Sequence, residues 1–159
     1  MNIDIVCVGK IKEKYFRDAL AEYQKRLGRY CRLRILEAAD EPTKENASRE
    51  EKERILTAEG SRILRLIPEN AYVIALAILG KKYDSPGMAS MLEGLMNRGS
   101  SSIVFVIGGS MGLSDEVLQR ADHAMSFSDL TFPHQMMRVI LMEQIYRSFR
   151  IMRGEPYHK

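Results

Sequence analysis

Short apolar runs alternate with helical patterns along the whole of this chain. Because strands that alternate with helices form parallel sheets with crossover helices, the sequence predicts an α/β fold: a mostly parallel sheet with helices on both faces. No repeat, low-complexity tract or linker interrupts the pattern, which predicts a single domain over residues 1–159. The expected strands are 2–8, 32–38, 71–79, 103–107 and 124–127. The expected helices are 14–27, 85–98, 117–121 and 134–152. A further helix is expected between a loop at 42–47 and residue 68. The run at 71–79 is apolar throughout, which is typical of a strand buried on both faces.

The length of the chain and its counts of cysteine and histidine exclude several classes of protein. A chain of 159 residues can bury a core without disulfides, and its two cysteines are too few and too far apart for a disulfide scaffold. Its three histidines share no metal-ligand spacing, so we expect no metal. No apolar run approaches the roughly 18 residues of a membrane span, and residues 1–6 lack the pattern of a signal peptide. We therefore expect a cytosolic protein without membrane contact.

Two loops follow apolar strands, and these loops are the first indication of function. One is the glycine loop at 108–112, Gly-Gly-Ser-Met-Gly, and the other spans 126–134. Ligands bind at the carboxyl ends of strands in open α/β sheets, so the loops predict one small-molecule pocket built mainly from main chain. The glycine spacing fits neither the Walker loop nor the dinucleotide fingerprint. A loop with exposed amides and no cation suits a ligand such as adenine; the alternative is a tight turn without a ligand.

The segment 134–152 predicts a long helix that is apolar on almost every side. Such a helix is either central to its domain or covered by a partner, and a symmetric homodimer is the commonest partner. Arg138 falls inside the apolar arc. Because an unpaired buried guanidinium is costly, Arg138 should meet an anion or a ring of carbonyls, unless it escapes to solvent from the first turn.

Several segments together resemble one known family, the RlmH family of small SPOUT-class methyltransferases of 23S ribosomal RNA. The segments are IGGSMGL at 107–113, SFSDLTFPH at 126–134 and RGEPYHK at 153–159, with VGKIK at 8–12 and IALAILGK at 74–81. The resemblance implies an α/β sheet with a C-terminal trefoil knot and a homodimer. It also implies binding of S-adenosylmethionine in the knot and methylation of N3 of a pseudouridine in 23S rRNA within the ribosome.

Site residues follow from the same resemblance. By residue type, His158 is the expected general base, Tyr157 the aromatic residue that stacks on or orients the target base, and Arg138 a further residue of the catalytic site. We expect the tail to order over the partner's pocket when RNA binds; without the resemblance, the tail would be taken for a frayed terminus. His134 is a weaker candidate, with a capping or packing role. The implied cofactor-binding residues are Leu76, Gly108, Phe127, Ser128, Asp129, Leu130, Thr131 and Phe132.

Contacts with RNA are expected from dispersed cations, because the net charge is only +3. Two other functions fit the same residues: a SPOUT methyltransferase acting on another base, such as one in tRNA, and a non-catalytic ribosome-associated factor. The expected RNA-contacting cations are Lys10, Lys12, Lys14, Arg17, Arg147, Arg150, Arg153 and Lys159.

Overall fold

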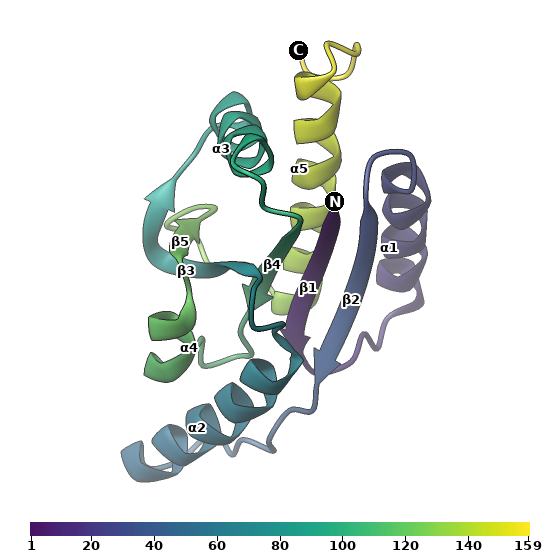
Figure 1. Cartoon of the computed structure of the whole chain (residues 1–159). Helices are drawn as coiled ribbons and strands as arrows, with labels where there is room; N and C mark the ends of the chain where they lie inside the picture. The colour runs from purple at the N-terminus through teal and green to yellow at the C-terminus, as the bar shows by residue number, and fades with distance from the viewer.

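Five parallel strands form one sheet in the order β2-β1-β4-β3-β5 (Figure 1), in a computed structural model that describes residues 1–159. Every neighbouring pair is parallel, which confirms the predicted fold class. The strands are β1 Asn2–Val8, β2 Arg32–Ala38, β3 Tyr72–Lys82, β4 Ser102–Ile107 and β5 His123–Ser126. The helices are α1 Lys14–Leu27, α2 Arg49–Leu66, α3 Ser85–Asn97, α4 Asp115–Arg120 and α5 His134–Met152.

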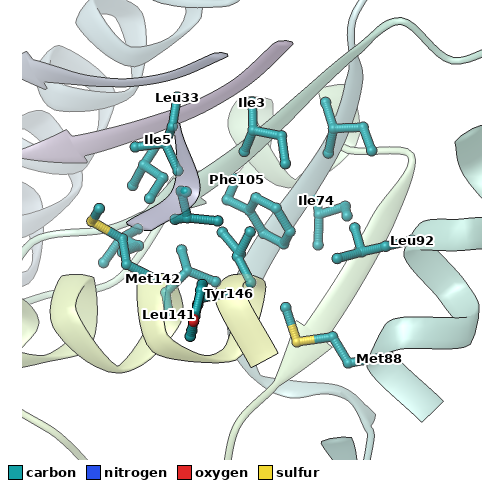
Figure 2. Close-up of a cluster of buried hydrophobic side chains, with 14 of the residues drawn as sticks. Ile3, Ile5, Leu33, Ile74, Met88, Leu92, Phe105, Leu141, Met142 and Tyr146 are labelled. Atoms are coloured by element: carbon teal, nitrogen blue, oxygen red, sulfur yellow. The ribbon is translucent and has the colours of Figure 1, made fainter. Parts of the chain in front are cut away.

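Both faces of the sheet are covered, as the apolar strands predict. Ile3 and Ile5 of β1 point to one face, where α1, α3 and α5 pack around Phe105. Figure 2 shows Phe105 surrounded by side chains from neighbouring strands and from two of these helices. Val6 and Val8 point to the other face, where α2 and α4 complete a smaller cluster. The period of two along β1 therefore divides the core into two layers.

Short polar side chains begin three of the helices. Ser48 accepts a hydrogen bond from the backbone of the first turn of α2, and Asp84 does the same for α3. Ser114 accepts one from Val117 N at the start of α4. These caps satisfy amides that have no partner within the helix, and they fix where the chain turns after β3 and β4.

The prediction for β3 was wrong in its second half. The strand is buried only to Ala75; beyond it, Ile78 is 56% exposed and Leu79 is 99% exposed. The pairing with β5 explains the difference, because Leu76 and Lys81 both lie opposite Met125 and the residues between them bulge out of the ladder. The bulge also extends the strand to Lys82, past the glycine that was expected to end it.

The long helix α5 is central to its own domain. It packs against α1, α3 and the sheet, and in Figure 1 it runs behind β1 and β4. Of its large apolar side chains only Met136 is exposed. Burial of the apolar side chains of this helix therefore needs no partner chain. Three large apolar residues near the sheet are exposed, and they lie in a loop and in the β3 bulge: Ile78, Leu79 and Leu130. None of the helices combines the length and the apolar character that crossing a bilayer requires.

Gly80 tests how closely β3 and β5 approach at the bulge. A Cβ at this position would lie 2.6 Å from the amide nitrogen of Met125. We expect Gly80→Ala to lower the free energy of unfolding by about 1–3 kcal/mol, the usual range for overpacking. Gly94→Ala is the control, because its Cβ would meet only Arg98 Nη1 at 3.6 Å in a helix that favours alanine. Equal urea midpoints for the two variants would contradict the close approach.

Candidate functional site

A cleft opens at the carboxyl ends of β3, β4 and β5, where the two loops were predicted to meet. This strand-end cleft is lined by residues from 76–78 of β3, from the glycine loop 107–112, from the loop 125–132, and by His134 and Met137 of α5. It spans about 720 Å³, a volume that includes the open solvent at its mouth. The structure thus brings the two loops into one site.

Most of the expected cofactor-binding residues line this cleft. Asp129 does not line it, because its side chain is 79% exposed and pairs with Lys82 Nζ at 2.5 Å. Sequence reasoning missed Met137 and gave His134 only a weaker role, and both enter the wall because α5 starts directly beneath the cleft. The expected residues that do line it are Leu76, Gly108, Phe127, Ser128, Leu130, Thr131 and Phe132.

The glycine loop is folded back on itself. Gly112 N donates to Gly109 O at 3.1 Å, and Gly112 has a φ of +84°, which favours glycine. A Cβ on Gly108 would collide with the backbone carbonyl of Gly112. Beneath the loop, Glu59 of α2 faces Gly109, and burial raises the pKa of that carboxyl. A side chain therefore does not fit at Gly108, where the loop presents backbone to the cleft.

No charged side chain lines the strand-end cleft. Its one titratable residue is His134, where burial, followed by the nearby charge of Arg138, lowers the imidazole pKa. The ring is therefore neutral at pH 7. His134 is the first residue of α5 and lies half-buried in the cleft wall, which fits the packing alternative of its expected role. The cleft is suited to a ligand that carries its own positive charge.

Arg138 is 1% exposed and meets both an anion and carbonyls, which confirms the prediction made for its burial. Its Nη1 donates to Glu37 Oε2 at 2.8 Å. Its Nη2 donates to the carbonyls of Val8 and Gly9 at 3.1 and 2.7 Å. Arg138 does not line the cleft, and it lies in the first turn of α5 while the tail follows the last. Its assignment to catalysis stays a prediction.

The C-terminal tail folds back along α5. Tyr157 packs its ring edge-on against Tyr146 and donates its hydroxyl to Glu143 Oε1 at 3.1 Å. His158 Nδ1 lies 3.2 Å from Arg147 Nη1, and the same arginine is paired with Glu143. These contacts hold the two expected catalytic residues of the tail together.

A second cavity holds His158. This tail cavity is lined by residues 83–86 and 88, by Met125, Ser126 and Phe127, and by Gln144 and His158. It shares Met125, Ser126 and Phe127 with the strand-end cleft. The end of β5 is therefore a common wall, with the cleft on one side and His158 on the other.

The cations expected to contact RNA fall into two groups. Some are engaged within the chain: Lys14 pairs with Asp18, Arg147 with Glu143 and Arg150 with Glu155, and Arg17 donates to two backbone carbonyls. The others make no salt bridge and stay available to an anionic partner. These are Lys10, Lys12, Arg153 and Lys159.

Comparison with known proteins gives a consistent result. Residues 1–158 match the family model described as a predicted SPOUT methyltransferase. The chain is 58% identical to the ribosomal RNA large subunit methyltransferase H of Clostridioides difficile and 56% identical to that of Clostridium novyi. It is 55% identical to the protein of the same name from Bifidobacterium adolescentis. Each comparison covers all of this chain and all of the relative.

The buried guanidinium of Arg138 should contribute to the stability of the fold. Arg138→Met leaves the buried carbonyl of Val8 without its donor and Glu37 without its counter-ion. We expect a loss on the order of 3 kcal/mol in the free energy of unfolding, measured by urea denaturation. Arg65→Met, a change at an exposed position of α2, should cost less than about 0.5 kcal/mol. A neutral Arg138→Met would refute the structural role.

Proposed function

The chain belongs to the SPOUT methyltransferase family, and from that premise we propose that it methylates N3 of a pseudouridine in 23S ribosomal RNA, on the ribosome. S-adenosylmethionine is the proposed methyl donor. The observation that carries the proposal is the uncharged cleft formed where the two strand-end loops meet. The full-length similarity to proteins named as methyltransferases of large-subunit ribosomal RNA supports the choice of substrate.

The residues of the strand-end cleft fit this donor. S-adenosylmethionine supplies an electrophilic methyl group on a positively charged sulfur when it is bound. Backbone groups of the glycine loop and of residues 127–132 would hold its adenine by the edges, while Leu76 and Phe132 provide apolar contact. Because the lining has no fixed cation and His134 is neutral, nothing in the cleft repels the sulfonium.

Removal of the proton from N3 is assigned to His158. A guanidinium only donates hydrogen bonds, so the contact between Arg147 Nη1 and His158 Nδ1 requires a lone pair on Nδ1. That lone pair is engaged by Arg147 in this arrangement, so we propose that Nδ1 exchanges the guanidinium for the N3 proton when the target base enters. The tail cavity gives the ring access to the wall shared with the cleft, and a base held there would take the N3 proton as the methyl group is transferred.

Tyr157 has a different part. Burial, together with the hydrogen bond to Glu143, raises the pKa of Tyr157 to about 12. The phenol therefore stays protonated near neutral pH and cannot be the base. Its hydroxyl fixes the tail to Glu143, and its ring is the proposed stacking surface for an unpaired base of the RNA.

The test is methyl transfer to ribosomes from a strain that lacks the gene. Radiolabel from the donor is expected in 23S rRNA. Removing residues 157–159 should lower the rate at least about 100-fold, the lower bound for loss of a general base, while donor affinity measured by calorimetry changes less than about threefold. Arg65→Met, at an exposed position of α2 with no proposed role in the reaction, is the control and should leave the rate near that of the full chain.

The other outcomes are equally informative. Label in tRNA in place of 23S rRNA would favour another SPOUT target. Bound donor without transfer to any RNA would favour a non-catalytic ribosome-associated factor. Full activity in the protein without 157–159 would exclude the tail from catalysis.

A homodimer, a trefoil knot and a cytoplasmic location complete the proposal. Ile78 and Leu130 line the cleft and are also exposed, and the exposed Leu79 follows Ile78 in the chain. A second copy that covered these side chains would close the mouth of the cleft and could bring its own tail to it.

The proposed dimer can be tested by changing the exposed apolar residues Ile78, Leu79 and Leu130. Sedimentation equilibrium at micromolar concentration should show a dimer for the parent protein and more monomer for Leu79→Lys, because a charge there opposes burial. The control is Leu118→Lys, at a position that is 38% exposed on α4. A parent protein that is only monomeric would refute the dimer.

A further inference from the structure

An open groove lies between the end of β3 and one side of α3, and the function proposed above does not use it. Its lining includes Lys81, Lys82, Tyr83, Ser90, Gly94 and Arg98, and this set is called the basic groove below. The groove encloses about 1070 Å³ up to its open mouth. Only two of its nine lining residues are hydrophobic, so it does not resemble a surface that buries a protein partner.

Two cations of the basic groove have no carboxylate partner. Lys82 is paired with Asp129, and Asp84 accepts the capping hydrogen bond of Gly87 N at the start of α3. Lys81, by contrast, lies over the ring of Tyr83, with Nζ 4.9 Å from the ring centroid. Arg98 follows the last turn of α3 and makes no salt bridge. Lys81 and Arg98 therefore have no ion pair, and with Lys82, Asp84 and Asp129 counted the groove carries a net charge of +1.

The surface of α3 is shaped to hold one of these charges over the groove. A Cβ on Gly94 would lie 3.6 Å from Arg98 Nη1, so the guanidinium lies along the helix where a side chain is missing. Gly94 and Ser90 have no side chain or a small one, so little projects from the helix on this side. An extended, negatively charged chain could approach the helix closely here.

The position of the basic groove connects it with the proposed reaction. The groove shares Tyr83 and Asp84 with the tail cavity that holds His158. The tail cavity in turn shares the end of β5 with the strand-end cleft. The three hollows therefore follow one another, from the cleft through the catalytic tail to the groove.

We propose that the basic groove binds phosphate groups of the ribosomal RNA strand next to the target nucleotide. The inference rests on the function proposed above and adds a substrate-binding subsite to it. Lys81 and Arg98 supply the charge for two phosphates. Lys82, already bridged to Asp129 of the loop 125–132, places the groove beside that loop.

A second copy of the chain is a poorer occupant. The exposed apolar residues suited to self-association are Ile78, Leu79 and Leu130, and none of them lines the basic groove. Two facing copies of the groove would also bring like charges together.

The experiment compares two double variants with the same change in charge. Lys81→Glu with Arg98→Glu reverses the groove, and Arg49→Glu with Arg65→Glu reverses two exposed cations of α2 on the other face of the sheet. Binding to ribosomes is measured by filter retention over a range of salt, and methyl transfer is measured on the same ribosomes. Calorimetry with S-adenosylmethionine confirms that each variant keeps its cleft.

We expect the groove variant to bind ribosomes at least about tenfold more weakly, since each lost contact to a phosphate is charge-assisted. The slope of log K against log salt should fall by about 1.4 for two phosphates on a single strand. KM for ribosomes should rise more than kcat falls, because the reacting groups are untouched. Lys81→Gln with Arg98→Gln should show the same direction, without the added negative charges.

Equal ribosome affinity and equal salt slope in the groove and control variants would overturn the inference. Cross-links from the groove to a ribosomal protein, with none to RNA, would also overturn it. If the parent protein bound ribosomes through the groove but transferred no methyl group, the proposed function would fail while the subsite stood.

Discussion

A buried guanidinium joins the start of α5 to the carboxyl ends of β1 and β2. Arg138 uses one nitrogen for Glu37 and another for the carbonyls of Val8 and Gly9. Hydrogen bonds to charged groups contribute about 1.5–3 kcal/mol each, more than neutral ones, so this tie fixes the axial position of the helix. Apolar packing alone would allow a helix to slide along its neighbours. The tie places His134 and Met137 in the wall of the strand-end cleft.

The same helix carries the C-terminal tail at its other end, and the Glu143 carboxylate connects the groups there. Glu143 accepts hydrogen bonds from Arg147, Tyr157 and the side-chain amide of Gln144. Gln144 in turn accepts from Ser85 Oγ at the start of α3. Because these groups share one network, the tail, α5 and α3 are coupled through side chains that are partly shielded from water. The helix therefore links the position of the sheet to that of Tyr157 and His158.

The distribution of charge separates two tasks. The strand-end cleft has no charged side chain, which suits a cationic donor, whereas the unpaired cations lie outside it, along the basic groove and near the tail. A cation inside the cleft would repel the sulfonium, and a neutral exterior would give no attraction for phosphate. Because the net charge is only +3, attraction of an anionic partner depends more on the positions of the cations than on their number.

The sequence by itself determined the order of strands and helices, the parallel sheet and the two loops, because the periods of two and 3.6 are local properties of the chain. It also determined that Arg138 needs partners, although it could not name Glu37 as one of them. The tertiary structure alone decided the bulge in β3, the outward turn of Asp129, and the place of α5 between α1 and α3. It also decided that His158 lies across the end of β5 from the cleft. These features depend on contacts between residues far apart in the chain, and local periodicity carries no information about such contacts.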